Sequence, residues 1–241
     1  MRLPRGSLRI ASVLALALAG CRAAPHDAEE KAGPFPPADR PVAQIVSSRW
    51  STEEARDRLN EATEVMNKAG IKPGMTVADI GAGEGYYTIR LGERIGKKGR
   101  VVAEDIVPAV TEALSQRVLR GPQLGNVFVQ LGLPTNPKLP DASFDRVLMV
   151  HMYHEIEQPY EFLWRMRPAL KPDGLVVVVD ANRLTQNHGT PPTLLKCEFG
   201  AVGYQLVEMD DMPSAGGYLA TFRAVGPRPE PKAIKPCKLG G

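Results

Sequence analysis

The stretch "VADIGAGEGYY", residues 77–87, decides the fold, because an apolar run gives way there to closely spaced glycines. The residues before the glycines are typical of a buried strand, and those after them have helical spacing. Gly81, Gly83 and Gly85 let the chain turn sharply and bring backbone N–H groups against a ligand. The stretch therefore predicts a strand, a ligand-binding turn and a helix.

Strand-like and helical segments alternate around this stretch. Ser51 and Glu54 have capping-box spacing, and together with Gly70 they predict a helix over 51–69. The remaining pattern predicts strands over 76–80, 100–106, 126–131, 144–150 and 175–180, with helices over 86–95, 108–120, 159–170 and 193–202.

Two further strands are expected over 204–212 and 217–225, and they are too close in sequence for a helical crossover. The sequence therefore predicts an α/β fold with a doubly wound, Rossmann-like, seven-stranded sheet. The sheet is expected to be mostly parallel, with an antiparallel C-terminal strand, in a single domain over 45–226.

The glycine spacing separates two classes of cofactor. In the dinucleotide fingerprint G-x-G-x-x-G the third glycine follows two intervening residues, but here it arrives one residue early and Tyr86 takes the expected place. Asp79 precedes the first glycine, and Asp105 ends the second strand, where a carboxylate can accept from ribose hydroxyls. Alternation along the strand places Glu104 on the other face. An NAD-dependent oxidoreductase is therefore disfavoured.

These residues and the strand pattern resemble motif I of the class I S-adenosylmethionine (SAM)-dependent methyltransferases. The resemblance implies SAM as cofactor, with Asp79 on its cationic amino group and Asp105 on its ribose. On the adenine side, "LGLPTNPKLP" (131–140) has Thr135 and Asn136 where relatives often carry acids, so Asn136 is expected to accept through its side-chain oxygen. The expected cofactor-binding residues are Asp79, Gly81, Gly83, Gly85, Tyr86, Asp105, Gly132 and Asn136.

The stretch "MVHMYHEIEQP" (149–159) follows the fourth strand, at the sheet edge where doubly wound folds bind ligands. It resembles a subgroup of small bacterial methyltransferases with a Tyr-His-Glu motif at this place. His151 or His154 can act as a general base with Glu155 as orienting partner, these residues can only position the substrate, or they can simply hold the loop in shape. No metal site is expected, because His151, His154 and Glu155 do not match the H-E-x-x-H spacing.

Two other stretches border the same edge. Asp180 and Asn182 end the fifth strand, as substrate contacts or as caps of the loop backbone. Residues 183–203 lie where relatives place a cover over the substrate, and His188 within them is expected to be solvated.

The N-terminal residues 1–20 combine three arginines with an apolar stretch of ten residues, which is typical of a secretory signal. The stretch ends in Leu-Ala-Gly-Cys, which resembles the lipobox of bacterial lipoproteins and implies lipidation of Cys21. Residues 21–44 are expected to be a disordered tether. The expected location is the cell envelope, lipid-anchored on the periplasmic side, or the cytoplasm if the signal is not used.

Without that signal the chain has 27 basic and 27 acidic residues, a balance that argues against nucleic-acid binding. Cys197 and Cys237 are enough for one disulfide, but Cys237 lies in a tail, 227–241, that is rich in Pro, Lys and Gly. The tail is expected to be disordered, and a disulfide scaffold is not implied.

The sequence therefore predicts an exported, lipid-tethered SAM-dependent methyltransferase that acts on a small molecule or a cell-envelope component. The alternative is a module on the same fold that binds SAM or another nucleoside without catalysis.

Overall fold

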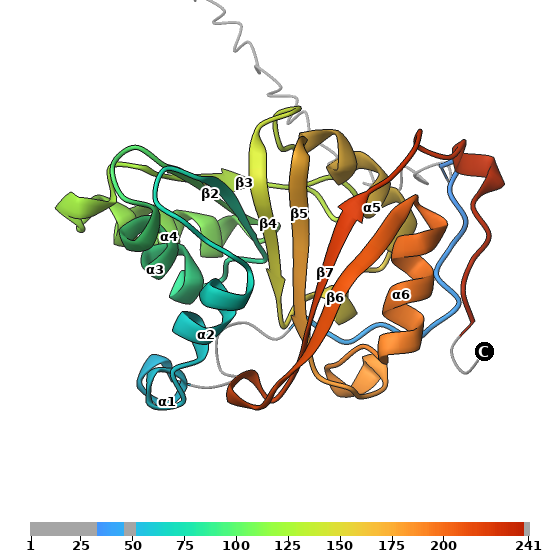
Figure 1. Ribbon diagram of the computed structural model, residues 1–241, viewed down its shortest axis with the longest axis horizontal. Helices are drawn as coiled ribbons and strands as arrows, with labels where there is room; N and C mark the ends of the chain where they lie inside the picture. The colour runs from blue at the N-terminus through green and yellow to red at the C-terminus, as the bar shows by residue number, and fades with distance from the viewer. Residues whose placement is uncertain (1–32, 46–51, 239–241) are drawn as a thin grey trace, which may run out of the picture. The chain divides into compact units, whose positions relative to one another are not determined.

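The computed structural model describes residues 33–45 and 52–238, which contain one seven-stranded sheet of order β3-β2-β1-β4-β5-β7-β6 (Figure 1). Strands β1 to β5 pair in parallel, whereas β7 is antiparallel to both β5 and β6. The predicted fold class is confirmed. The strands are β1 (Thr76–Ile80), β2 (Arg100–Asp105), β3 (Val127–Leu131), β4 (Phe144–Val150), β5 (Leu170–Asp180), β6 (Tyr204–Met212) and β7 (Gly217–Ala224).

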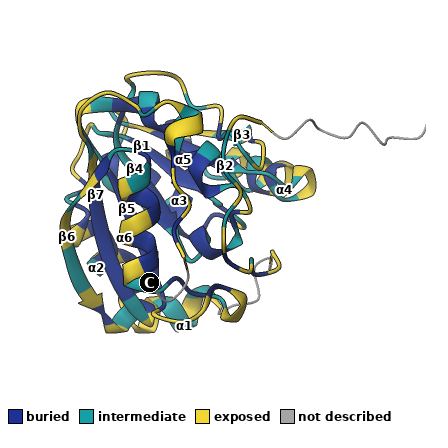
Figure 2. Cartoon of the chain, turned by 90° about the vertical axis from the view of Figure 1, so that its right-hand side faces the viewer, coloured by how far each residue is buried: buried dark blue, intermediate teal, exposed yellow. Residues whose placement is uncertain are grey.

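Neighbouring residues of a strand point to opposite faces of the sheet, and both faces are covered by helices. Val77 packs in a cluster with Met66 and Leu91, whereas the next residue, Ala78, packs in a cluster with Phe162. Figure 2 shows the resulting buried layer. The helices are α1 (Glu53–Arg58), α2 (Glu61–Lys68), α3 (Tyr86–Ile95), α4 (Pro108–Leu119), α5 (Pro159–Met166) and α6 (Pro192–Ala201).

The helix predicted over 51–69 is interrupted. Asn60 has a left-handed backbone with φ of 57°, a conformation that asparagine tolerates, so the chain bends between α1 and α2. Thr52 caps α1 by accepting from the Ala55 N–H, while Ser51, the predicted cap, lies outside the described residues.

The helix predicted over 159–170 is shorter than expected. It ends at Met166 and continues as a short 3₁₀ helix, Arg167–Ala169, before β5 begins at Leu170. Pro168 accounts for the difference, because it has no N–H to continue the α-helical hydrogen bonds.

The predicted disordered tail is packed on the domain as far as residue 238. Cys237 forms a disulfide with Cys197 of α6, and its N–H donates to the Tyr160 hydroxyl at 2.6 Å. Trp164 of α5 donates through Nε1 to the Pro229 carbonyl. The Pro-rich segment 227–238 is therefore held on the domain by specific contacts.

Part of the predicted tether, residues 33–45, also lies against the domain. Arg40 donates through Nε to Glu198 Oε1 at 2.9 Å, and both side chains are 0% exposed. Tyr153 donates its hydroxyl to the other Glu198 oxygen at 2.7 Å. Asp39 forms an isolated parallel bridge with Lys238, so the two segments meet, as the blue and red traces of Figure 1 show.

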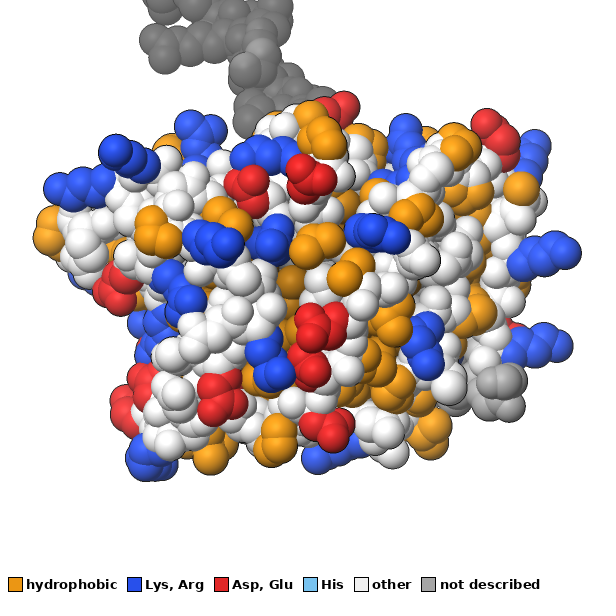
Figure 3. All heavy atoms as spheres, in the orientation of Figure 1, with side chains coloured by type: hydrophobic (Ala, Val, Ile, Leu, Met, Phe, Trp, Pro, Cys, Tyr) orange, Lys and Arg blue, Asp and Glu red, His pale blue; other side chains and the backbone are white. Residues whose placement is uncertain are grey.

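No helix within residues 33–45 and 52–238 has the length and apolarity that a bilayer span requires. The predicted signal over 1–20 and the predicted lipidation of Cys21 lie outside the described residues. Basic and acidic side chains are interspersed on the face drawn in Figure 3, in keeping with the balanced charge of the sequence.

Candidate functional site

A cavity opens at the carboxyl ends of β1 and β4. The glycine-rich loop forms one wall, and the residues after β4 form the other. The cavity thus brings expected cofactor residues and expected acceptor residues together. Its lining residues are Arg56, Asp79, Gly81, Ala82, Tyr86, Tyr87, Val150, His151, His154, Glu155 and His188.

The glycine-rich loop needs its glycines for backbone and for packing reasons. Gly81, Gly83 and Gly85 all have positive φ, of 66°, 55° and 91°. A Cβ at Gly81 would lie 2.9 Å from Cγ of Met152, which follows β4. The loop therefore packs directly against the residues that follow β4, on the acceptor side of the cavity.

Asp79 lines the cavity at the base of this loop. Thr88 donates its hydroxyl to Asp79 Oδ2 at 2.6 Å. Burial raises the pKa of Asp79 to about 6, although the Thr88 hydrogen bond favours the charged form. Above that pH the carboxylate is ionised, which suits the cationic amino group that the sequence resemblance assigns to it.

Asp105 shapes the loop from the end of β2. Its Oδ2 accepts from the Gly83 N–H at 3.0 Å and its Oδ1 accepts from the Val107 N–H at 2.9 Å. Each carboxylate oxygen retains a second lone pair, so the residue can still accept from ribose hydroxyls. It does not itself line the cavity.

Glu104 precedes Asp105 on β2, and alternation along the strand places it on the other face. Burial, reinforced by the Asp105 charge, raises the pKa of Glu104 to about 8. Its Oε1 is buried without a hydrogen-bond partner in the protein, an orphaned acceptor that a ligand hydroxyl can satisfy. A Cβ at Gly132 would overlap this carboxyl group, so Gly132 makes room for Glu104.

Asn136, predicted to accept from the adenine amino group, also takes part in its own loop. Its Oδ1 accepts from the Lys138 N–H at 2.8 Å, and its backbone closes a turn with Leu133. Asn136 does not line the cavity, but its Oδ1 retains a second lone pair, so its role toward adenine stays a prediction.

Arg56 and Glu61 form a charged cluster over the cavity that the sequence analysis missed. Arg56 lies 3.8 Å from the Tyr86 ring centroid and pairs with Glu61 at 2.6 Å. Burial alone would raise the pKa of Glu61, but hydrogen bonds from His151 and Arg56 outweigh it and lower the pKa to about 2. Tyr86, predicted to lie against the cofactor, therefore also holds Arg56 in place.

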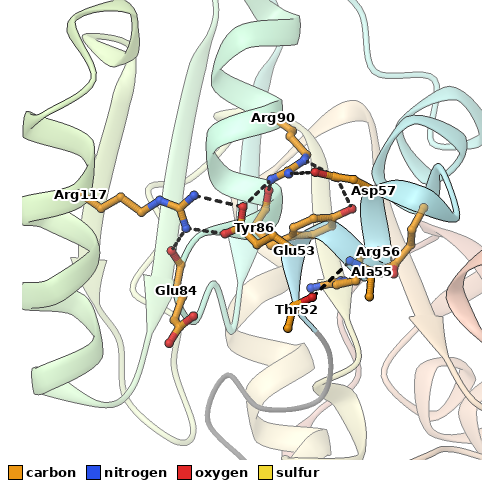
Figure 4. Close-up of polar contacts among 10 residues, drawn as sticks. Thr52, Glu53, Ala55, Arg56, Asp57, Glu84, Tyr86, Arg90 and Arg117 are labelled. Atoms are coloured by element: carbon orange, nitrogen blue, oxygen red, sulfur yellow. Dashed lines mark hydrogen bonds and ion pairs between the residues drawn. The ribbon is translucent and has the colours of Figure 1, made fainter.

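Helix α1 is held over the glycine-rich loop by further ion pairs (Figure 4). Glu53 accepts from both Arg90 of α3 and Arg117 of α4, at 3.3 and 2.6 Å. Arg117 also donates to the Glu84 carbonyl inside the loop at 2.8 Å. These contacts couple α1 to the loop backbone.

On the acceptor side, His154 is oriented by Asp180. His154 is 3% exposed, and its Nδ1 lies 3.0 and 3.1 Å from the two Asp180 oxygens. An ionised carboxylate only accepts, so Nδ1 donates, and in the neutral form of the ring Nε2 then carries the lone pair. Asp180 also accepts from the Ala181 N–H and the Thr190 hydroxyl, which fixes its position.

Glu155, considered as an orienting partner of His151 or His154, lies farther from the His154 ring than Asp180 does. Glu155 Oε1 lies 4.0 Å from His154 Nε2, on the other side of the ring from Asp180. Because β4 and β5 are neighbouring parallel strands, their ends meet at one edge, and this adjacency was the available signal for Asp180. Asn182, considered beside Asp180, is exposed and does not line the cavity.

The other two cavity histidines have left-handed backbones. His151 has φ of 55°, and its Nε2 lies 3.6 Å from Glu61 Oε1. His188 has φ of 54° and lines the cavity, with its ring centroid 5.5 Å from that of His154. His188, expected to be solvated, is half-buried at the edge of the cavity.

Comparisons with known proteins agree with this geometry. Residues 78–178 match the family model of a methyltransferase domain. The ubiquinone/menaquinone biosynthesis C-methyltransferase UbiE of Hydrogenovibrio crunogenus is 28% identical over 65% of this chain and 57% of that protein.

Two solved structures share the fold. A SAM-dependent methyltransferase from Aquifex aeolicus has a TM-score of 0.58 at 23% identity, covering 71% of this chain and 97% of that one. The glycopeptide N-methyltransferase MtfA complexed with sinefungin has a TM-score of 0.58 at 14% identity, covering 76% and 92%.

The chain spans less than two thirds of the length of the first curated relatives that it matches. The matched segment contains the glycine-rich loop, Asp79, Asp105 and His154. Residues 78–178 are accordingly similar to a methyltransferase domain, and the two solved structures share the fold of this chain.

Proposed function

We propose that this protein is an exported, lipid-tethered methyltransferase that methylates a small-molecule or cell-envelope acceptor. The observation that carries the proposal is the cavity itself, where the glycine-rich loop and Asp79 face the Asp180-oriented His154. When bound, SAM supplies a methyl group on a positively charged sulfur. The residues of the chain hold that cofactor and bring an acceptor into line with it.

Asp79 and Asp105 are assigned to the cofactor, and His154 to the acceptor. The orphaned Glu104 oxygen is a further acceptor near the glycine-rich loop for a cofactor hydroxyl. Asp180 holds the His154 ring so that the Nε2 lone pair is presented on the side away from Asp180. That lone pair favours acceptors whose reacting group carries an ionisable hydrogen.

Export is supported by the disulfide as well as by the signal-like residues 1–20. Disulfides form and persist in oxidising compartments and are rare in the cytosol. Cys197 and Cys237 are joined, and this bond secures a C-terminal segment beside the acceptor half of the sheet. Lipidation of Cys21 would tether the exported chain, since several acyl chains hold a protein firmly.

The cofactor assignment is tested by calorimetry on the full chain in detergent, with SAM as ligand and NAD as comparator. We expect SAM to bind and NAD not to bind, with SAM binding lost in the Asp79→Ala, Asp105→Ala double variant. NAD binding in place of SAM binding would contradict the assignment.

The acceptor assignment is tested by incubating the protein with SAM and an envelope extract. The S-adenosylhomocysteine that is released measures methyl transfer. Asp180→Asn is expected to lower turnover by about 10²–10⁴-fold, because His154 loses its orientation, while SAM affinity stays the same. Equal turnover in the variant and the parent would contradict the role of Asp180.

Localisation is tested by fractionating cells that express the full chain or Cys21→Ser. We expect the parent in the membrane fraction and the variant free in the periplasm. Recovery of both from the cytoplasm would mean that the signal is not used.

A further inference from the structure

We propose that His154, Glu155 and His188 bind one divalent transition-metal ion of the Zn²⁺ type at the acceptor end of the cavity. One ligand atom from each residue lies within 4.8 Å of the other two. The inference rests on the proposed function in one respect, since the metal ion would bind the methyl acceptor. The binding of the ion itself depends only on these three side chains.

The geometry needs only a small contraction to hold an ion. His154 Nε2 and Glu155 Oε1 are 4.0 Å apart, and the two imidazole rings are nearly perpendicular, at 85°. Ligand atoms around one Zn²⁺ lie roughly 3–3.5 Å from each other, because each bond is about 2.0–2.2 Å long. The ligand atoms therefore have to approach one another by up to about 1.8 Å.

Asp180 supplies the outer contact that metal-binding histidines usually have. Such a histidine donates its second ring N–H to a carboxylate or carbonyl, which fixes the tautomer and leaves the other nitrogen for the metal. His154 has this arrangement, since its Nδ1 contacts Asp180 and its Nε2 faces Glu155. Asp180 is held in turn by the Thr190 hydroxyl at 2.7 Å.

His188 is held near the other two residues by an unusual backbone. Its φ of 54° is rare for a residue other than glycine, and such conformations persist where the surroundings fix them, often at functional sites. The His188 N–H donates to the Thr185 carbonyl, and the Thr185 hydroxyl donates to the Pro41 carbonyl at 2.6 Å. The N-terminal segment therefore braces the third ligand.

The donor set selects the kind of ion. Two imidazoles and one carboxylate suit Zn²⁺ and its neighbours in the first transition row, whereas Mg²⁺ and Ca²⁺ prefer oxygen ligands. Three protein ligands leave a position open, as in catalytic zinc sites. An acceptor hydroxyl bound there would be stabilised as its anion, with its proton passing to solvent. The His154 lone pair would then coordinate the ion.

The test is a titration of the full chain, purified without a histidine tag, with Co²⁺ followed by Zn²⁺. We expect one Co²⁺ per chain, with visible absorption typical of four or five ligands, and displacement by Zn²⁺. Glu155→Gln and His188→Gln are each expected to weaken Zn²⁺ binding by more than about 100-fold, and Asp180→Asn by about 10–100-fold. His151→Gln is the matched control, because His151 lines the same cavity outside the cluster.

Absence of Zn²⁺ binding at millimolar concentration would overturn the proposal, as would affinities unchanged in Glu155→Gln and His188→Gln. An equal loss in His151→Gln would overturn the assignment of these three ligands. SAM calorimetry on each variant reports whether the fold is retained. SAM binding without Zn²⁺ binding would contradict only the metal site. Zn²⁺ binding without methyl transfer would contradict only the proposed function.

Discussion

The two walls of the cavity are built in different ways. Asp79 and the glycine-rich loop of the cofactor wall, with Asp105 that holds this loop, come from one continuous stretch, residues 79–105. The acceptor wall takes His154, Asp180 and His188 from three separate segments. The comparison teaches that the cofactor wall depends on local backbone geometry, whereas the acceptor wall depends on how distant segments dock.

The largest expected effect concerns the docking of residues 33–45. Arg40→Ala is expected to lower the free energy of unfolding by about 3–5 kcal/mol, because Glu198 would remain as a buried, uncompensated charge. Urea unfolding measures the loss. The control is Arg165→Ala, which removes a partly exposed helical pair with Glu161 and should cost less than about 0.5 kcal/mol. Similar losses in both variants would contradict the importance of this docking.

Removing the disulfide tests how the C-terminal segment supports the acceptor wall. The double variant Cys197→Ser, Cys237→Ser is expected to lose about 2–4 kcal/mol, since the bond joins residues 40 apart in sequence. Hydrogen exchange should rise in α5 and α6, while SAM affinity is retained. A parallel loss of SAM affinity would show that the two walls are not independent.

The cofactor wall is tested by two glycines with similar backbones. Gly74 and Gly85 have φ of 85° and 91°, but only at Gly85 would an added Cβ overlap a side chain, that of Leu114. Gly85→Ala should therefore cost about 1–3 kcal/mol more than Gly74→Ala in thermal unfolding. Equal costs would mean that φ alone requires the glycine.

The last prediction concerns how stability changes with pH rather than a single loss at one pH. Burial raises the pKa of Glu104 from 4.5 to about 8, so its contribution to stability is lost as the pH rises through that interval. Glu104→Gln should remove a slope of up to about 1.4 kcal/mol for each pH unit. Unfolding at pH 5, 6.5 and 8 measures it, and parallel curves for parent and variant would contradict the shift.

The sequence predicted what depends on local patterns. The doubly wound sheet, its antiparallel C-terminal strand and the glycine-rich turn follow from periodicity and from the lengths of the connections. The partner of His154 did not follow, because Asp180 is adjacent to it only through the pairing of β4 with β5. His188 was expected only to be solvated, because its place beside His154 depends on how the loop after β5 folds.

Composition misled at the ends of the domain. Proline-rich segments are expected to stay disordered when they bury little apolar surface. Here residues 33–45 and 227–238 are held by Arg40, by Cys237 and by the bridge between Asp39 and Lys238. The buried ion pair and the disulfide hold these segments although they bury little apolar surface. Such contacts cannot be predicted from composition.

The pairing of Arg40 with Glu198 also sets an order of events in folding. The two residues are 158 positions apart, so Arg40 is made early and its partner much later. Contacts that close such long loops form late, because the loop-closure entropy must be overcome first. The sheet and its glycine-rich turn can therefore assemble before residues 33–45 dock, and the acceptor wall is the last part of the cavity to mature.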